Sequence, residues 1–141
     1  MKKIILAQPL INIKDSSKIL NSVLRSNFIN EGSQTKEFEK KICKLLKVKY
    51  AVATTSGTIA IFLALKAAGI KNGDEVIIPN ITFPATANAV KMAGGKIILA
   101  DVNPINLLID EKSLIKRINP KTKFIIPVHV SGRGENIRKI V

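Results

Sequence analysis

From residue 50 onward, short apolar runs alternate with helical patterns along this 141-residue chain. Strands are predicted at residues 50–53, 75–79, 96–101 and 122–130, and helices between them at 57–68, 85–93 and 111–118. Continuous apolar runs are typical of parallel strands that are buried on both faces. Regular alternation of such strands with helices predicts right-handed crossovers and a three-layer α/β domain with a mostly parallel sheet.

Two amphipathic helical patterns precede this alternation, one from Asp15 or Ser16 to about residue 26 and one over residues 35–47. Their apolar positions recur at helical spacing and are Ile19, Leu20, Val23 and Leu24, then Phe38, Ile42, Cys43, Leu45 and Leu46. We predict that residues 1–47 form an N-terminal arm with two helices, which packs on something else. Residues 48–141 are expected to be part of a larger domain, because a helix predicted to begin at Glu135 reaches the end of the sequence without a cap.

The net charge of +13 raises the possibility of a basic nucleic-acid-binding domain. The lysines are spread through every segment, however, and aromatic residues make up only 4% of the chain, which leaves few stacking platforms. This pattern favours a lysine-rich solvated surface. The single cysteine, Cys43, excludes an internal disulfide framework, and its place on an apolar helix face predicts a buried structural thiol.

The apolar runs are too short to span a bilayer, and the N-terminus lacks the features of a signal peptide. The chain is therefore expected to be cytoplasmic.

A hydroxyl-rich turn, Thr54-Thr55-Ser56-Gly57-Thr58, separates the first predicted strand from an apolar helix. The first N–H groups of a helix have no internal acceptor, and the helix dipole favours negative charge there. Ser56 and Thr58 add hydroxyl donors, and Gly57 lets a ligand approach the backbone closely. The turn therefore predicts a phosphate site, although turns of this composition also occur without a ligand.

Ligands of open parallel sheets bind beyond the carboxyl ends of the strands, where four loops of this chain are expected to meet: 54–58, 80–84, 101–104 and 129–134. Beyond the first turn, their polar and aromatic residues are Asn80, Thr82, Phe83, Asp101, Asn103, His129, Ser131 and Arg133. Such a set suits a flat, phosphorylated cofactor. The alternatives are a core role for Phe83, a loop-capping role for Asp101 and a structural role for His129. Zinc is not expected, because the chain has no second histidine.

Taken in order, segments such as YAVATTSGTIAIF, IIPNITFPATANAV and KFIIPVHVSGRGE resemble the DegT/DnrJ-type sugar aminotransferases over roughly residues 10–140. These are pyridoxal-phosphate enzymes of the aspartate-aminotransferase-like fold (fold type I). The resemblance implies that Gly57, Thr58 and the backbone of Ile59 hold the cofactor phosphate, that Ser56 supports the turn, and that Phe83 lies against the pyridine ring. It places residues 48–141 in the cofactor-binding large domain.

The resemblance also implies an activity and partners. A homodimer would transfer an amino group, typically from glutamate, to a nucleotide-linked keto sugar for surface polysaccharide or secondary-metabolite synthesis. The family's Schiff-base lysine, and the aspartate that pairs with the pyridinium nitrogen, are expected beyond Val141. No catalytic residue is therefore assigned within the chain, and the 141 residues alone are expected to be inactive. The alternatives are a sugar dehydratase of the same fold, in which a histidine replaces the lysine, and an inactive truncated remnant.

Overall fold

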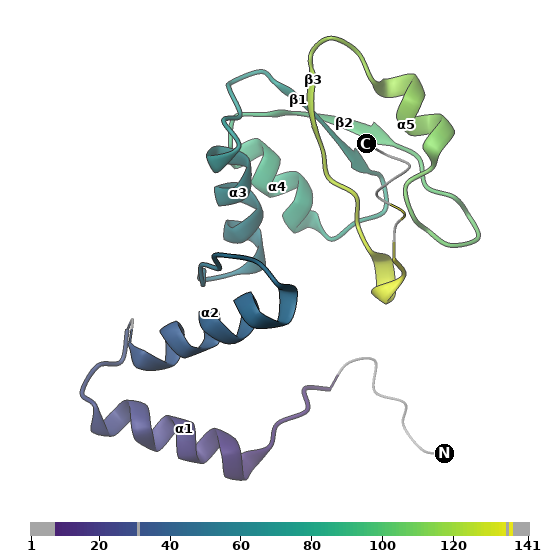
Figure 1. Cartoon of the computed structure of the whole chain (residues 1–141). Coiled ribbons are helices and arrows are strands. Elements are labelled where there is room, and N and C mark those ends of the chain that lie inside the picture. Colours follow the sequence, from purple (N-terminus) through teal and green to yellow (C-terminus); the bar gives the residue numbers. More distant parts are fainter. Residues whose placement is uncertain (1–7, 31, 135, 137–141) are drawn as a thin grey trace, which may run out of the picture. The chain divides into compact units, whose positions relative to one another are not determined.

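The computed structural model describes residues 8–30, 32–134 and 136, and the chain divides into two compact units (Figure 1). The first unit is Met1–Ala53 and the second is Thr54–Val141.

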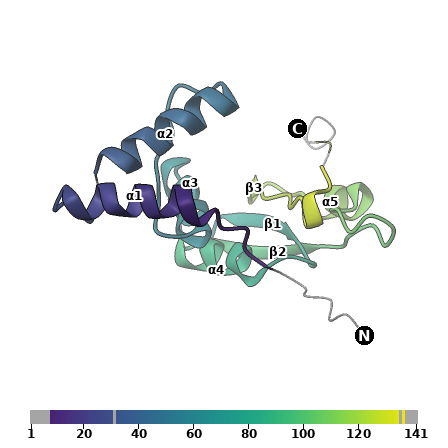
Figure 2. The same cartoon turned by 90° about the horizontal axis from the view of Figure 1, so that it is seen from below.

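The first unit contains helices α1 (Ile13–Arg25) and α2 (Ser33–Leu46), joined by a turn (Figure 2). Helix α1 begins earlier than predicted, because the Asn12 side chain caps it by accepting a hydrogen bond from the Asp15 N–H at 3.2 Å. Cys43 is a free thiol that is half-buried rather than buried as predicted. The large apolar side chains of both helices are exposed, including Ile19, Leu20, Leu24, Phe38, Leu45 and Leu46.

The strand predicted at residues 50–53 is wrong, because this segment is not part of any sheet in the described structure. An extended segment becomes a strand only when a neighbour pairs with its backbone. Here the Ala53 N–H donates instead to Glu39 Oε1 on α2, at 2.8 Å. Tyr50 and Val52 in this segment are exposed.

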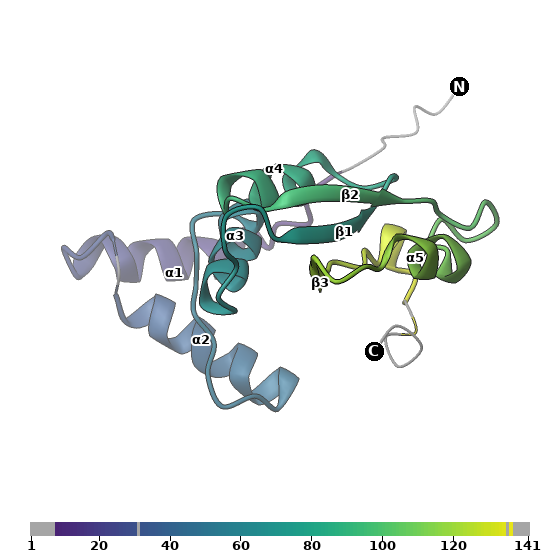
Figure 3. The same ribbon diagram turned by 90° about the horizontal axis from the view of Figure 1, so that it is seen from above.

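The second unit is a three-stranded parallel sheet with helices, in the order β2–β1–β3 (Figure 3). Its elements follow one another as α3 (Gly57–Ala67), β1 (Glu75–Pro79), α4 (Pro84–Met92), β2 (Lys96–Ala100), α5 (Glu111–Arg117), β3 (Thr122–Ile125) and the 3-10 turn η1 (Val130–Gly132). Ile77 at the centre of β1 pairs with Ile98 on one side and Ile125 on the other. The predicted parallel pairing of the strands is confirmed.

Strand β3 ends at Ile125, five residues before the predicted end. The last ladder bond runs from the Ile126 N–H to the Ile77 carbonyl at 2.9 Å. Pro127 follows, and a proline has no N–H with which to continue a ladder. The helix predicted to begin at Glu135 lies outside the described residues.

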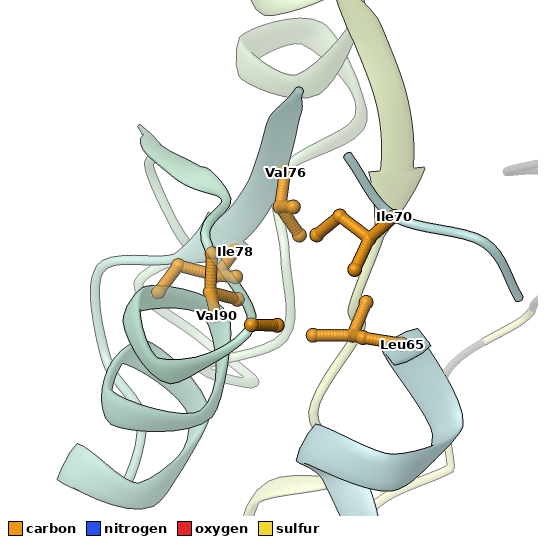
Figure 4. Close-up of a cluster of buried hydrophobic side chains, with 6 residues drawn as sticks. Leu65, Ile70, Val76, Ile78 and Val90 are labelled. Atoms are coloured by element: carbon orange, nitrogen blue, oxygen red, sulfur yellow. The ribbon is translucent and has the colours of Figure 1, made fainter. Parts of the chain in front are cut away.

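Strand β1 is buried along its whole length, and its alternate side chains face opposite layers. Val76 and Ile78 pack in a cluster with Leu65, Ile70 and Val90, which belong to α3, α4 and the turn after α3 (Figure 4). Ile77 belongs to a second cluster with Ala100, Ile109 and Leu114 of α5. Helices therefore cover both faces of the sheet, which confirms the three-layer α/β prediction.

Candidate functional site

Helices α3 and α4 pack against each other, and in Figure 1 both begin at their lower ends. Helix α4 begins shortly after β1 ends, at Pro84. The last residues of α3 are joined by a turn to the first residue of β1, so the chain reverses direction between them. The first residue of α3, Gly57, therefore lies toward the carboxyl end of β1. The predicted phosphate turn and the loop that carries Phe83 therefore lie at one edge of the second unit.

Ser56 is the N-cap of α3, with an extended backbone. Its Oγ accepts a hydrogen bond from the Ile59 N–H at 3.3 Å, and its carbonyl accepts one from Thr54 Oγ1 at 3.0 Å. Serine is a preferred N-cap because its hydroxyl satisfies one of the first N–H groups of the helix. The Ile59 N–H, which the family resemblance assigns to the phosphate, thus donates to Ser56 Oγ in this structure.

The backbone N–H groups of Gly57 and Thr58 stand at the first two positions of α3, where a helix offers no internal acceptor. A Cβ added at Gly57 would meet nothing within 4 Å, so the space in front of this backbone is open. Two N–H donors, the nearby Ser56 and Thr58 hydroxyls and the positive end of the helix dipole form a donor set that suits a phosphate group. The residues present therefore fit the phosphate of a cofactor.

Phe83 lies on the surface, with 78% of the residue exposed, so the alternative that it is a core residue is wrong. It is the N-cap of α4 and has an extended backbone, with φ −69° and ψ 141°. Pro84 follows it and restricts the preceding residue to such extended conformations. An exposed aromatic ring on a short, fixed turn offers a flat face to a planar ligand.

The other polar candidates mainly hold the loops together. Asn80 Nδ2 donates to Asp101 Oδ1 at 3.1 Å, which links the ends of neighbouring strands β1 and β2. Asn103 Oδ1 accepts from the Ile105 N–H at 2.9 Å within its own loop. Arg133 Nη1 donates to the Asn106 carbonyl at 3.3 Å. These contacts give the four residues structural roles, which agrees with the capping alternative for Asp101.

One polar residue near the site was not singled out from the sequence. Thr86 is buried in the first turn of α4, and its hydroxyl lies 2.9 Å from that of Thr82. An available signal was a threonine just before a predicted helix start with a second threonine in the first turn, since hydroxyl side chains near a helix start often form local hydrogen bonds.

Within residues 8–30, 32–134 and 136, no group of three or more His, Cys, Asp or Glu side chains is placed to hold a metal ion. None of the helices formed by these residues is long and apolar enough to cross a membrane.

Comparison with known proteins gives consistent matches. A model of the DegT/DnrJ/EryC1/StrS aminotransferase family matches residues 11–141. The chain is 40% identical, over 128 residues, to the 3-oxo-glucose-6-phosphate:glutamate aminotransferase of Bacillus subtilis, and the match covers 91% of this chain and 29% of that protein.

Solved structures are also similar. One is the PMP-form of a Streptococcus pneumoniae protein named as a sugar aminotransferase (TM-score 0.91, 28% identity, 99% of this chain and 35% of that chain). Another is the E. coli GDP-4-keto-6-deoxy-D-mannose-3-dehydratase with bound hydrated PLP (TM-score 0.84, 28% identity, 95% and 36%). The chain thus spans about a third of the length of these relatives.

Proposed function

Since the chain belongs to the DegT/DnrJ/EryC1/StrS aminotransferase family, we propose that it is the part of a pyridoxal-phosphate-dependent aminotransferase that holds the phosphate and the ring of the cofactor. One observation carries this proposal: helices α3 and α4 pack against each other, with the open, donor-rich start of α3 and the exposed Phe83 at the start of α4 on the same side of the second unit.

In this proposal the Gly57 and Thr58 N–H groups donate to the phosphate, and the Thr58 hydroxyl adds a third donor. Ser56 stabilises the turn by accepting a hydrogen bond from the Ile59 N–H. In the proposed complex that N–H would donate to the phosphate as well. Phe83 covers one face of the pyridine ring and excludes water from it. When bound, pyridoxal phosphate supplies the electron sink on which amino-group transfer depends.

We propose that the whole protein transfers an amino group from glutamate to a nucleotide-linked keto sugar. The name of the B. subtilis relative supports a keto sugar and glutamate as the reacting pair. The name of the E. coli relative supports a nucleotide-linked sugar, since its substrate carries GDP. Because that relative is a dehydratase, a sugar dehydratase is the second candidate function.

The wider setting is part of the same proposal. Residues 48–141 would belong to the cofactor-binding domain, and the protein would work as a cytoplasmic homodimer whose product feeds surface polysaccharide synthesis. The exposed apolar side chains of α1, such as Leu20 and Leu24, support the dimer because apolar surface of this kind is usually covered by a partner.

A charge placed at the start of α3 tests the phosphate site. Titration of pyridoxal phosphate into the chain, followed by calorimetry, should show binding that Gly57→Asp weakens at least about tenfold relative to Gly57→Asn, because the two variants differ only in charge. The carboxylate should not lower the free energy of unfolding, since a negative charge is favourable at a helix start. Equal affinity of the two variants, or no binding by the unmodified chain, would contradict the proposal.

A further inference from the structure

Helix α4 begins without the usual cap. Its N-cap residue is Phe83, whose side chain cannot accept a hydrogen bond, and its first residue is Pro84, which has no N–H. The exposed Phe83 ring also gains little packing from the protein that would hold it in place. The direction in which this side chain leaves the protein is therefore set by the backbone of the turn on which it stands.

Two threonine residues flank Phe83 in the sequence, Thr82 before it and Thr86 after it, and their hydroxyls lie close together. Thr82 Oγ1 lies 2.9 Å from Thr86 Oγ1, and the Thr86 N–H donates to the Phe83 carbonyl at 3.1 Å. Thr86 is only 5% exposed and belongs to the same helix as the buried Ala89 and Val90. A hydroxyl buried in such surroundings needs a hydrogen-bond partner, and the Thr82 hydroxyl provides one.

The backbone of Phe83 is thus restrained by the residues on both sides of it in the sequence. Pro84 restricts its backbone to an extended conformation, and the bridge from Thr82 to Thr86 ties the residue before it to the first turn of α4. We propose that Thr86, acting through Thr82, is a positioning residue that aims the Phe83 ring at the cofactor. This inference rests on the proposed function, in which Phe83 covers the pyridine ring.

The first test needs no cofactor. In the 141-residue chain with ¹⁵N-labelled phenylalanine, the backbone N–H signal of Phe83 is assigned by its absence in Phe83→Leu. Thr86→Val keeps the shape of the side chain and removes the hydroxyl, and it should lower the order parameter of the Phe83 backbone N–H from about 0.85 toward 0.6 or below. Thr86→Ser keeps the hydroxyl and should preserve the order.

Thr82→Val is a second variant for the case that Thr86→Val fails to fold. It removes the same hydrogen bond, but from Thr82, which is only half-buried. The two single variants and the double variant should disorder Phe83 equally, since all three lack one and the same bond. An unchanged order parameter in Thr86→Val, or additive losses in the double variant, would overturn the inference.

The second test couples the bridge to the ligand. Thr86→Val should weaken pyridoxal phosphate binding about fivefold, the size expected for one hydrogen bond. In a Phe83→Leu background the same substitution should have no further effect. An equal effect in both backgrounds would show that Thr86 does not act through Phe83. If even the unmodified chain binds no cofactor, the proposed function fails, while the order parameter still decides the role of Thr86.

Discussion

At the scale of single residues, Glu75 shows how one buried carboxylate can join three segments. It is the first residue of β1, is 4% exposed, and accepts hydrogen bonds from Asn119 Nδ2 at 2.7 Å and from Lys96 Nζ at 2.9 Å. The Asn119 hydrogen bond, followed by the interaction with Lys96, holds the pKa of the Glu75 carboxyl below its ordinary value. The start of β1 is thereby tied to β2 and to the turn that precedes β3.

This lowered pKa predicts a pH dependence of stability. A group whose pKa is lower in the folded state stabilises the fold above its unfolded pKa, about 4.3 for glutamate, and loses that contribution as the pH falls through the folded value. Urea denaturation between pH 7 and pH 3 should therefore show a shallower acid loss in Glu75→Gln than in the unmodified chain.

Glu37→Gln is the matched control, because Glu37 also has a lowered pKa, caused first by its hydrogen bond with Lys41, but lies on the surface. Exposed ion pairs contribute little, so its effect on the slope should be smaller. Identical slopes for Glu75→Gln and the unmodified chain would contradict this role of Glu75.

At the scale of elements, the turn from α4 into β2 uses two glycines for different reasons. Gly94 has φ +89°, a conformation that residues with a Cβ rarely adopt. At Gly95 the restriction is space: an added Cβ would lie 2.9 Å from Ile70 Cδ1 and 3.0 Å from Val90 Cγ1. Helix α4 and the start of β2 can approach the core this closely only because no side chain stands between them.

Gly95→Ala should accordingly destabilise the chain by about 1–3 kcal/mol, the usual cost of overpacking a core. Urea denaturation followed by circular dichroism measures this loss. Gly134→Ala is the control, since a Cβ there would meet nothing within 4 Å and should change the free energy of unfolding by less than about 0.5 kcal/mol. A neutral Gly95→Ala would mean that the core relaxes around the added methyl group.

At the scale of the whole molecule, the first unit has an apolar helix face that its own residues leave exposed. Leu20 is 58% exposed and Leu24 is 54% exposed, whereas Lys14, Lys18 and Asn21 form a polar stripe on the same helix. In the proposed homodimer the apolar face of α1 contacts the partner subunit, which removes this surface from water.

Sedimentation velocity tests that assignment. Leu20→Glu should shift the chain from dimer toward monomer, because it places a charge in the proposed contact. Asn21→Glu changes the net charge equally on the polar stripe and should leave the sedimentation coefficient unchanged. A monomeric unmodified chain, or equal effects of both substitutions, would argue against a dimer formed through this face.

Local sequence patterns were enough to predict most of the second unit. The bounds of β1 and the start of α3 match the prediction, because an apolar run and a hydroxyl-rich turn that leads into an apolar helix are patterns of neighbouring residues. The same local reasoning identified the Ser56–Thr58 turn and placed Phe83 in the loop that follows a strand. The phosphate and ring-binding roles of these residues are still predictions.

Contacts between residues far apart in the sequence decided which predicted strands pair and where their ends lie. Residues 50–53 have strand-like composition, yet they pair with no strand in the part of the chain that the structure describes, and the Ala53 N–H donates to Glu39 instead. The apolar run after Ile125 leaves the sheet although its sequence continues the strand pattern. Strand pairing depends on which backbone lies alongside, and a hydroxyl bridge such as Thr82–Thr86 depends on how a helix starts and what buries it. The sequence by itself therefore determined which segments can form helices and strands, and only the tertiary structure decided which of them pair and where each side chain lies.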